Sequence, residues 1–318
     1  MTIYYAPLEG FTDAVYRKCH HTLFGGAEKY YIPFVSPTQN LRFTPKELSA
    51  VLPENNEGVP AVPQILSNDA GQFLWAANAL HDMGYNEINL NTGCPSGTVT
   101  AKYKGSGMLR DLDTLKRFLD EAFAKAPCPI SVKTRIGFTS PEEWDAILAL
   151  YRQYPIYELT IHPRTRVMQY GGIPVYAAFE QAVRELSLPL VYNGDLFTAK
   201  DCADFAEKHP GMPMMLGRGL LSNPALAREA NGGKKLTVDD IRAFHALLHE
   251  GYKAIHPWNV AQRRLCDAVK YMSLCFEDSF RVYKNLRKAP TEEAYLALAE
   301  KLFTEHELLP DPQFLPNA

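Results

Sequence analysis

The sequence Asn89-Leu90-Asn91-Thr92-Gly93-Cys94-Pro95 follows a short apolar run, Tyr85 to Leu90, and carries it into a loop. A run of this kind predicts a β-strand, and the glycine and proline predict where the strand ends. A thiol at a strand end, between a glycine and a proline, is placed for chemistry rather than for packing. Alone, the stretch remains compatible with a nucleophile, a redox thiol or no function.

Outward from this stretch, short β-branched or aromatic runs alternate with longer helical patterns. The predicted strands are Ile3–Ala6, Lys29–Pro33, Ala61–Leu66, Glu87–Asn91, Ile130–Arg135, Glu158–His162, Leu190–Asn193 and Met214–Leu216. The predicted helices are Ala14–Phe24, Pro45–Val51, Ala70–Met83, Asp113–Ala126, Pro141–Tyr154, Pro174–Leu186, Ala199–His209 and one that begins near Asn223.

Eight alternations of strand and helix predict a (β/α)8 TIM barrel. A doubly wound open sheet is the competing fold, and periodicity alone does not exclude it. The chemically interesting residues, however, fall at the C-terminal ends of different strands. Those ends converge on one mouth in a barrel and spread along a crevice in an open sheet, so we expect the barrel.

The pattern changes after Asn231-Gly232-Gly233, where a turn-forming sequence marks a boundary near residue 232. We expect a barrel domain over residues 1–232 and a small all-helical domain over residues 233–318. The helices predicted there are Val238–Ile255, Asn259–Phe276, Ser279–Ala289 and Thr291–Glu305.

Composition limits the possible classes of protein. The chain has 318 residues, 46% hydrophobic and 22% charged, which is ordinary for a globular protein and sufficient for a large core. Six scattered cysteines without a Cys-x-x-Cys pair favour a reducing compartment, which we take to be the cytoplasm, and argue against a structural zinc site. We expect no metal, no membrane span and a monomer. The net charge of −3 excludes a global basic field, so a polyanion would need a local basic patch, such as residues 263–288.

Two groups of residues indicate a site for an anionic ligand. Lys133 and Arg135 share one face of their strand, and a lysine inside a barrel needs an anionic partner. A flavin would supply one, although an internal salt bridge to Glu87 or Asp195 is an alternative. Glycines after the last two strands predict a phosphate site, as in many such barrels. Its residues are in Asn193-Gly194-Asp195 and Leu216-Gly217-Arg218.

Taken in order, these motifs resemble those of the tRNA-dihydrouridine synthase family. The resemblance covers about residues 3 to 225. It is carried by Ala6-Pro7-Leu8-Glu9-Gly10-Phe11-Thr12-Asp13, the Cys94 stretch, Val132-Lys133-Thr134-Arg135, His162-Pro163-Arg164-Thr165, Asn193-Gly194-Asp195 and Gly217-Arg218.

The resemblance implies an FMN-dependent enzyme that reduces the C5–C6 double bond of specific uridines in tRNA, with NADPH as the reductant. Cys94 would donate the proton to C5, and Asn91 would bind the uracil. The residues implied in FMN binding are Pro7, Leu8, Glu9, Gln64, Lys133, His162, Asn193, Gly194, Asp195, Gly217 and Arg218. Further substrate contacts are expected at Arg135, Arg164 and Arg166, with Lys102, Lys104 and the 263–288 stretch as candidate phosphate contacts.

Two other hypotheses remain at this point. The same barrel could reduce a free pyrimidine or a dihydroorotate-like molecule, with the helical extension used for assembly. It could also be a non-catalytic RNA-binding protein, which the presence of Cys94, Lys133 and His162 disfavours.

Overall fold

The computed structural model describes residues 1–312 and 314 of the chain. Nine strands form one sheet in the order β3-β2-β1-β9-β8-β7-β6-β5-β4. They are β1 Ile3–Tyr5, β2 Lys29–Tyr31, β3 Ala61–Val62, β4 Gln64–Ile65, β5 Ile88–Thr92, β6 Ile130–Gly137, β7 Leu159–Thr165, β8 Leu190–Tyr192 and β9 Met214–Leu216.

The two ends of this order, β3 and β4, are consecutive in the chain and separated by Pro63 alone, so the parallel sheet forms a nearly closed barrel. The predicted TIM barrel is confirmed. Its third predicted strand is divided because proline has no N–H to donate to a ladder. The Pro63 carbonyl still accepts from Asn89 N at 2.9 Å, which keeps the two halves aligned.

Helices alternate with the strands as predicted, and their starts have identifiable caps. Asp13, Asp69 and Asp111 each accept a hydrogen bond from a first-turn N–H. The helices are α1 Ala14–Leu23, α2 Pro45–Val51, α3 Ala70–Asp82, α4 Gly97–Thr100, α5 Leu112–Lys125, α6 Trp144–Tyr151, α7 Tyr176–Glu185, α8 Ala199–Lys208, α9 Arg218–Ser222, α10 Leu226–Ala230, α11 Val238–Ile255, α12 Trp258–Met272, α13 Phe280–Leu286 and α14 Glu292–Thr304.

The structure adds three features to the sequence-based expectation. The loop after Cys94 contains α4 and a 3-10 helix, Gly105–Arg110, and neither was predicted. Strand β7 continues to Thr165, three residues beyond its predicted end. Helix α9 begins at Arg218, directly after β9, whereas the sequence placed a helix start near Asn223.

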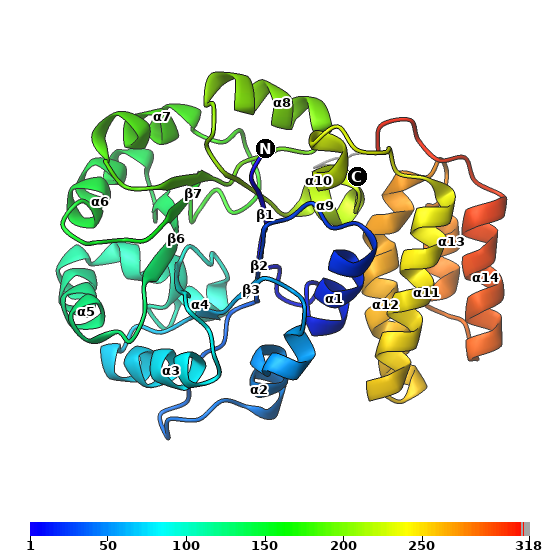
Figure 1. The fold of residues 1–318 in the computed structure, drawn as a ribbon, viewed down its shortest axis with the longest axis horizontal. Helices are drawn as coiled ribbons and strands as arrows, with labels where there is room; N and C mark the ends of the chain where they lie inside the picture. The colour runs from blue at the N-terminus through cyan, green and yellow to red at the C-terminus, as the bar shows by residue number, and fades with distance from the viewer. Residues whose placement is uncertain (313, 315–318) are drawn as a thin grey trace. The chain divides into compact units, whose positions relative to one another are not determined.

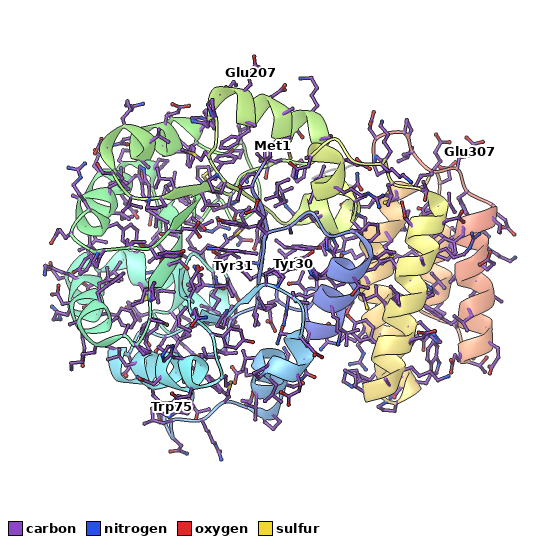
Figure 2. The ribbon with its side chains drawn as sticks, in the orientation of Figure 1. Met1, Tyr30, Tyr31, Trp75, Glu207 and Glu307 are labelled. Carbon is purple, nitrogen blue, oxygen red and sulfur yellow. The ribbon has the colours of Figure 1, made fainter. Side chains whose placement is uncertain are left out.

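The chain divides into two compact units. The first comprises Met1–Glu28, Leu196–Gly211 and Leu216–Ala318, and the second comprises Lys29–Asp195 and Met212–Met215. In the second unit, helices α3, α5, α6 and α7 follow one another around the outside of β6 and β7 (Figure 1). Tyr30 and Tyr31 of β2 lie inside this unit with no exposed surface (Figure 2).

The first unit is mostly helical, and α11, α12, α13 and α14 lie side by side in it (Figure 1). Helix α1 packs against α11, where Tyr252 Oη donates to the Asp13 carboxylate at 3.1 Å. A helical C-terminal region is therefore present, as expected. The sequence predicted only helices in this region, but Phe276 and Leu308 form an antiparallel β-bridge. The expected boundary near residue 232 stays a prediction.

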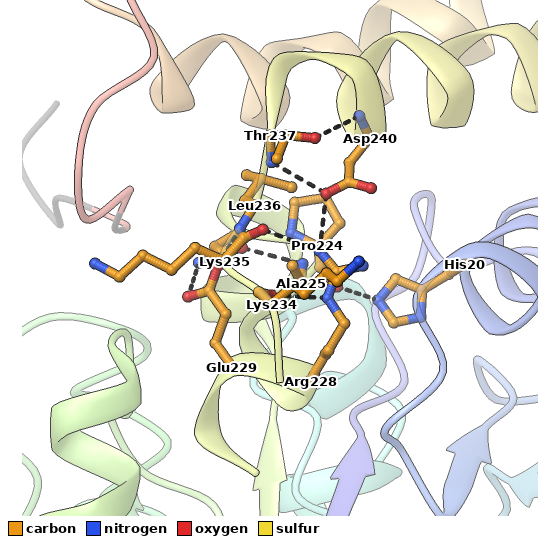
Figure 3. Close-up of polar contacts among 11 residues, drawn as sticks. His20, Pro224, Ala225, Arg228, Glu229, Lys234, Lys235, Leu236, Thr237 and Asp240 are labelled. Carbon is orange, nitrogen blue, oxygen red and sulfur yellow. Dashed lines mark hydrogen bonds and ion pairs between the residues drawn. The ribbon is translucent and has the colours of Figure 1, made fainter. Parts of the chain in front are cut away.

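A polar network organises the turn between α10 and α11 (Figure 3). Arg228 donates to the Lys234 carbonyl at 2.9 Å and pairs with Asp240 at 2.8 Å. Glu229 accepts from Leu236 N at 2.6 Å, so backbone groups of the turn have partners. These contacts fix the direction in which α11 leaves the Asn-Gly-Gly turn. Among the described residues, no helix has the length and apolar character that a membrane span requires.

Candidate active site

Most of the predicted site residues lie in strands β4 to β7 or soon after strands β5 and β8 of the second unit. The parallel register places Gln64 beside Asn89, Asn91 beside Lys133, and Arg135 beside His162. Residues at the C-terminal ends of parallel strands share one end of a barrel. The second unit therefore gathers these residues at one barrel mouth: Gln64, Asn91, Cys94, Lys133, Arg135, His162, Arg164, Asn193, Gly194 and Asp195.

The peptide of Cys94 is held from both sides. Asn91 Oδ1 accepts from Gly93 N at 3.0 Å and from Cys94 N at 2.8 Å. The Cys94 carbonyl accepts from Ser106 N at 3.1 Å and Ser106 Oγ at 2.8 Å. Gly105, at φ +57°, passes so close that a Cβ there would lie 2.9 Å from Cys94 Cβ. The sequence Gly105-Ser106-Gly107 thus supports the Cys94 loop.

Lys133 is a cation without a carboxylate partner among the described residues. Its Nζ donates to Asn193 Oδ1 at 2.6 Å. The alternative of a salt bridge to Glu87 or Asp195 is wrong, because these acids pair with Lys29 at 2.8 Å and Arg164 at 2.5 Å. Burial and the neighbouring Arg135 lower the pKa of Lys133 to about 7. An anionic group beside Nζ would restore its charge.

His162 is a neutral imidazole at neutral pH. Burial, reinforced by Arg135, Lys133 and Arg164, holds its pKa well below the usual range. The Asn193 carbonyl lies 2.5 Å from Nδ1 and can only accept, so Nδ1 carries the proton. Nε2 is then an acceptor, and Arg164 Nη1 approaches it at 3.5 Å.

Arg135 and Arg164 hold loops in this structure. Arg135 is 2% exposed and donates to the carbonyls of Gly93, Thr165 and Gln169 at 2.9, 2.9 and 2.7 Å. Arg164 is 1% exposed and binds the Asp195 carboxylate through both terminal nitrogens. Its remaining N–H groups donate to the Gly171 and Gly172 carbonyls and face His162. All five donors of Arg164 therefore have protein acceptors, and none is left for a phosphate in this conformation.

Arg166 has a different environment. Its Nε is buried and has no hydrogen-bond partner in the described part of the chain, and its guanidinium lies 5.4 Å from the Phe138 ring. Arg110, which the sequence reasoning missed, stacks on the same ring at 3.8 Å and is exposed. The 55% exposed Tyr103 lies beside Arg110 at 5.5 Å. This cation–aromatic group, Tyr103, Arg110, Phe138 and Arg166, suits a nucleic acid because bases and phosphates can both contact it.

The other predicted phosphate contacts are less uniform. Lys102 is exposed, whereas Lys104 donates to Ser36 Oγ at 2.9 Å. In the 263–288 stretch of the first unit, Arg264 donates to the Gly10 carbonyl at 3.3 Å. The other basic side chains of that stretch are exposed: Arg263, Lys270, Arg281, Lys284, Arg287 and Lys288.

The remaining predicted cofactor residues belong to the first unit. Ala6 N donates to the Leu216 carbonyl at 2.8 Å, which places Pro7, Leu8 and Glu9 next to the end of β9. A Cβ on Gly217 would contact Ala6 and Leu8 at 3.5 and 3.7 Å. The Arg218 guanidinium lies 5.4 Å from the Phe197 ring and 4.8 Å from the Phe314 ring, and these two rings contact each other.

Sequence reasoning also missed Asn89 and Ser131, which are hydrogen-bonded to the site through Gln64. Both are fully buried, and Asn89 bonds to Gln64 and Ser131 at 2.7 and 2.9 Å. The period-two rule that pointed Lys133 and Arg135 inward also points Asn89 inward with Asn91, and Ser131 inward with Lys133. That rule was the available signal.

Comparison with known proteins identifies relatives over almost the whole chain. Residues 4–306 match the family described as dihydrouridine synthase. A tRNA-dihydrouridine synthase B of Pasteurella multocida is 30% identical, over 71% of this chain and 68% of the relative. A probable tRNA-dihydrouridine synthase of Rhodobacter capsulatus is 25% identical, over 95% and 94%. Among solved structures, morphinone reductase is similar with a TM-score of 0.52 at 12% identity, over 76% of this chain and 88% of that one, which is a likeness of fold.

Proposed function

The chain belongs to the dihydrouridine synthase family, and we propose that it reduces the C5–C6 double bond of specific uridines in tRNA, with FMN as cofactor, NADPH as reductant and Cys94 as proton donor. The observation that supports this most directly is the Cys94 loop. It is held by Asn91 and Ser106 at the same end of the barrel as a lysine that lacks an anionic partner among the described residues.

The residues of the second unit fit a flavin. The ring of FMN presents carbonyl oxygens and nitrogens at its edge, and Lys133, Gln64 and Asn193 offer a cation and amides to such an edge. Neutral His162 adds an imidazole acceptor. Gly194 and Asp195 would contact the phosphate, and Gly217 and Arg218 of the first unit remain predicted phosphate residues. Asp195 would not repel it strongly, because Arg164 already neutralises its carboxylate. Pro7, Leu8 and Glu9 would lie along the ring.

When bound, FMN would supply the hydride that NADPH delivers to the enzyme. The residues of the chain perform the other tasks. Cys94 would protonate C5 of the uracil, and a thiol suits this because its usual pKa near ~8.5 leaves it protonated at neutral pH. Asn91 retains one amide N–H for the uracil, since its other N–H and its Oδ1 are engaged by Gln64, Gly93 and Cys94. Arg135 would keep the Cys94 loop in place, and Lys133 would balance negative charge.

The uridine must leave its stack in tRNA to reach a barrel mouth. We assign the surrounding contacts to Arg166 and Arg110 with Phe138 and Tyr103, and to Lys102. Arg164 is better assigned to shaping its loop. The exposed basic residues of the 263–288 stretch would bind the phosphate backbone. The proposal includes action as a monomer in the cytoplasm.

A cysteine replacement tests the central role. Cys94→Ala should bind as much FMN as the wild type, measured by flavin absorbance, and should lose dihydrouridine formation in unmodified tRNA. Cys128→Ala, at another half-buried cysteine, is the matched control and should keep activity. Full activity of Cys94→Ala would refute the role of the thiol. Turnover of free uracil at the same rate as tRNA would refute the substrate.

A further inference from the structure

A charged cluster lies at the opposite end of the second unit's strands from Cys94. Lys29, which opens β2, pairs with Glu87 at 2.8 Å and with Glu158 at 2.5 Å. Glu87 directly precedes β5, and Glu158 directly precedes β7. Both carboxylate side chains are 12% exposed, and each contacts the same amine. Glu87 Oε1 also accepts from Ser131 Oγ at 2.7 Å and from Tyr31 Oη at 3.3 Å.

From Glu87 a continuous chain of hydrogen bonds runs through the interior to Cys94. Asn89 Nδ2 donates to Ser131 Oγ at 2.9 Å, and Gln64 Nε2 donates to Asn89 Oδ1 at 2.7 Å. Asn91 Nδ2 then donates to Gln64 Oε1 at 2.7 Å. These four residues are at most 6% exposed, so no bulk water competes for the bonds.

All hydrogen bonds of this series donate toward Glu87, and the groups at its two ends require the same direction. Glu87 is a carboxylate and can only accept, so the Ser131 hydroxyl must donate to it and must accept from an amide N–H. Each amide in turn presents its NH2 toward Glu87 and its oxygen toward the barrel mouth. At the other end, Gly93 N and Cys94 N can only donate, so they require the oxygen of Asn91. Both ends demand the same orientation of every amide.

We propose that this chain, from Glu87 through Ser131, Asn89 and Gln64 to Asn91, positions Cys94 by fixing which atom of Asn91 faces the loop. Glu87, Ser131 and Asn89 are thus positioning residues for the thiol. Asn91 holds the proton donor in addition to any contact with uracil. The proposal rests on the proposed function only for the purpose of the thiol, and the outcomes that would overturn it are measured at Cys94 without turnover.

Loss of the Glu87 carboxylate would remove one of the two constraints on the orientation of the amides. If Glu87 becomes a glutamine, its side chain can donate or accept, and Ser131 is no longer obliged to donate. The orientation of the amides then depends on Gly93 N and Cys94 N alone, and a rotation by 180° would turn the NH2 of Asn91 toward these two backbone N–H groups. Such a contact is repulsive, so the Cys94 loop would sample other positions. Displacement of a reacting group by about 1 Å lowers rates by up to about a hundredfold.

The experiment compares Glu87→Gln with Glu158→Gln in the full-length protein. Each removes one carboxylate from Lys29 without changing side-chain size, so both should lower thermal stability, but only the first interrupts the chain. We expect Glu87→Gln to change the iodoacetamide alkylation rate of Cys94, resolved by peptide mass spectrometry, by about tenfold, and to speed amide exchange at Gly93 and Cys94. Glu158→Gln should stay within about twofold of the wild type at both readouts.

Ser131→Ala provides a second variant that changes no charge, and it reports even if Glu87→Gln fails to fold. It should alter Cys94 alkylation in the same direction, and kcat on tRNA should fall about tenfold with KM nearly unchanged. The proposal is overturned if Glu87→Gln and Glu158→Gln are equal at Cys94, or if Ser131→Ala leaves Cys94 at the wild-type rate. A failure of the proposed function would be seen in a different experiment, as dihydrouridine formation by Cys94→Ala.

Discussion

Replacing Lys133 by methionine should stabilise the flavin-free protein at low pH and weaken its binding of FMN. In the folded chain the pKa of Lys133 is lowered to about 7 from 10.5, chiefly by burial and then by Arg135. A shift of this size corresponds to about 5 kcal/mol at 1.36 kcal/mol per unit. The side chain is partly exposed, so solvent screening reduces the expected effect to about 2–3 kcal/mol.

The sign of the pH dependence follows from proton counting. Between pH 7 and 10.5 the unfolded chain holds a proton on Lys133 that the folded chain has released, so wild-type stability rises with pH across this window. Below pH 7 both states are protonated and the full cost of the buried charge is present. Methionine removes that cost but also removes the bond to Asn193 Oδ1, worth about 1 kcal/mol at any pH.

The assay is urea denaturation of both proteins, free of flavin, at pH 6 and pH 10. The free energy of unfolding of Lys133→Met relative to wild type should be higher at pH 6 by about 2–3 kcal/mol than at pH 10. Its affinity for FMN should fall at least about tenfold. Lys29→Met is the control and should destabilise, because it leaves Glu87 and Glu158 without their shared cation. A difference that does not change with pH would refute the reasoning.

Three other replacements test separate parts of the structure. Gly105→Ala should cost about 1–3 kcal/mol and reduce dihydrouridine formation, because its Cβ would press on Cys94 Cβ at 2.9 Å. Gly58, at φ +76°, also has a positive φ but open space around it, so Gly58→Ala is the control and should keep activity. Unchanged activity in Gly105→Ala would contradict the predicted contact with Cys94. Arg228→Met should lower the free energy of unfolding in urea by about 2 kcal/mol at pH 7, since Asp240 and the Lys234 carbonyl lose their donor. Burial opposes ionisation of Asp240, but Arg228 and Thr237 outweigh it and lower its pKa, so the difference should narrow as the pH falls below 3.8; a constant difference would argue against the ion pair. Tyr151→Phe should cost about 1 kcal/mol in urea, because its hydroxyl joins Thr92 and Thr134 at 2.9 and 3.1 Å, and no loss would show that the two threonines find other partners.

The fold was largely predictable because each strand and helix has a local signal. Short β-branched or aromatic runs alternating with helical patterns predicted the barrel, although the helix after β9 begins at Arg218 rather than near Asn223. The division of the third strand at Pro63 was not predicted. The missing N–H of proline interrupts the strand only through its pairing with a neighbouring strand, which the local sequence does not show. The short helix α4 and the 3-10 helix after Cys94 escaped prediction because close approach to Cys94 determines them, rather than periodicity.

The site was predictable in its residue types and less so in their bonds. Period two placed Lys133 and Arg135 inside the barrel, but no pattern states which acid pairs with which base. Only the structure shows that Lys29 pairs with Glu87 and that Arg164 pairs with Asp195, so that Lys133 has no carboxylate partner among the described residues. The loop contacts of Arg135 were equally hidden, since its three carbonyl acceptors come from distant parts of the sequence.

The composition of the first unit has a consequence for synthesis of the protein. Its opening segment, Met1–Glu28, shares that unit with Leu216–Ala318, so it leaves the ribosome about 190 residues before that long segment begins to appear. At about 5–20 residues per second, the delay lasts roughly ten to forty seconds. The second unit, which is nearly continuous in sequence, can fold during this interval. Until then α1 lacks its partner α11, so in nascent chains that end at Asp195 the α1 segment should remain open to protease.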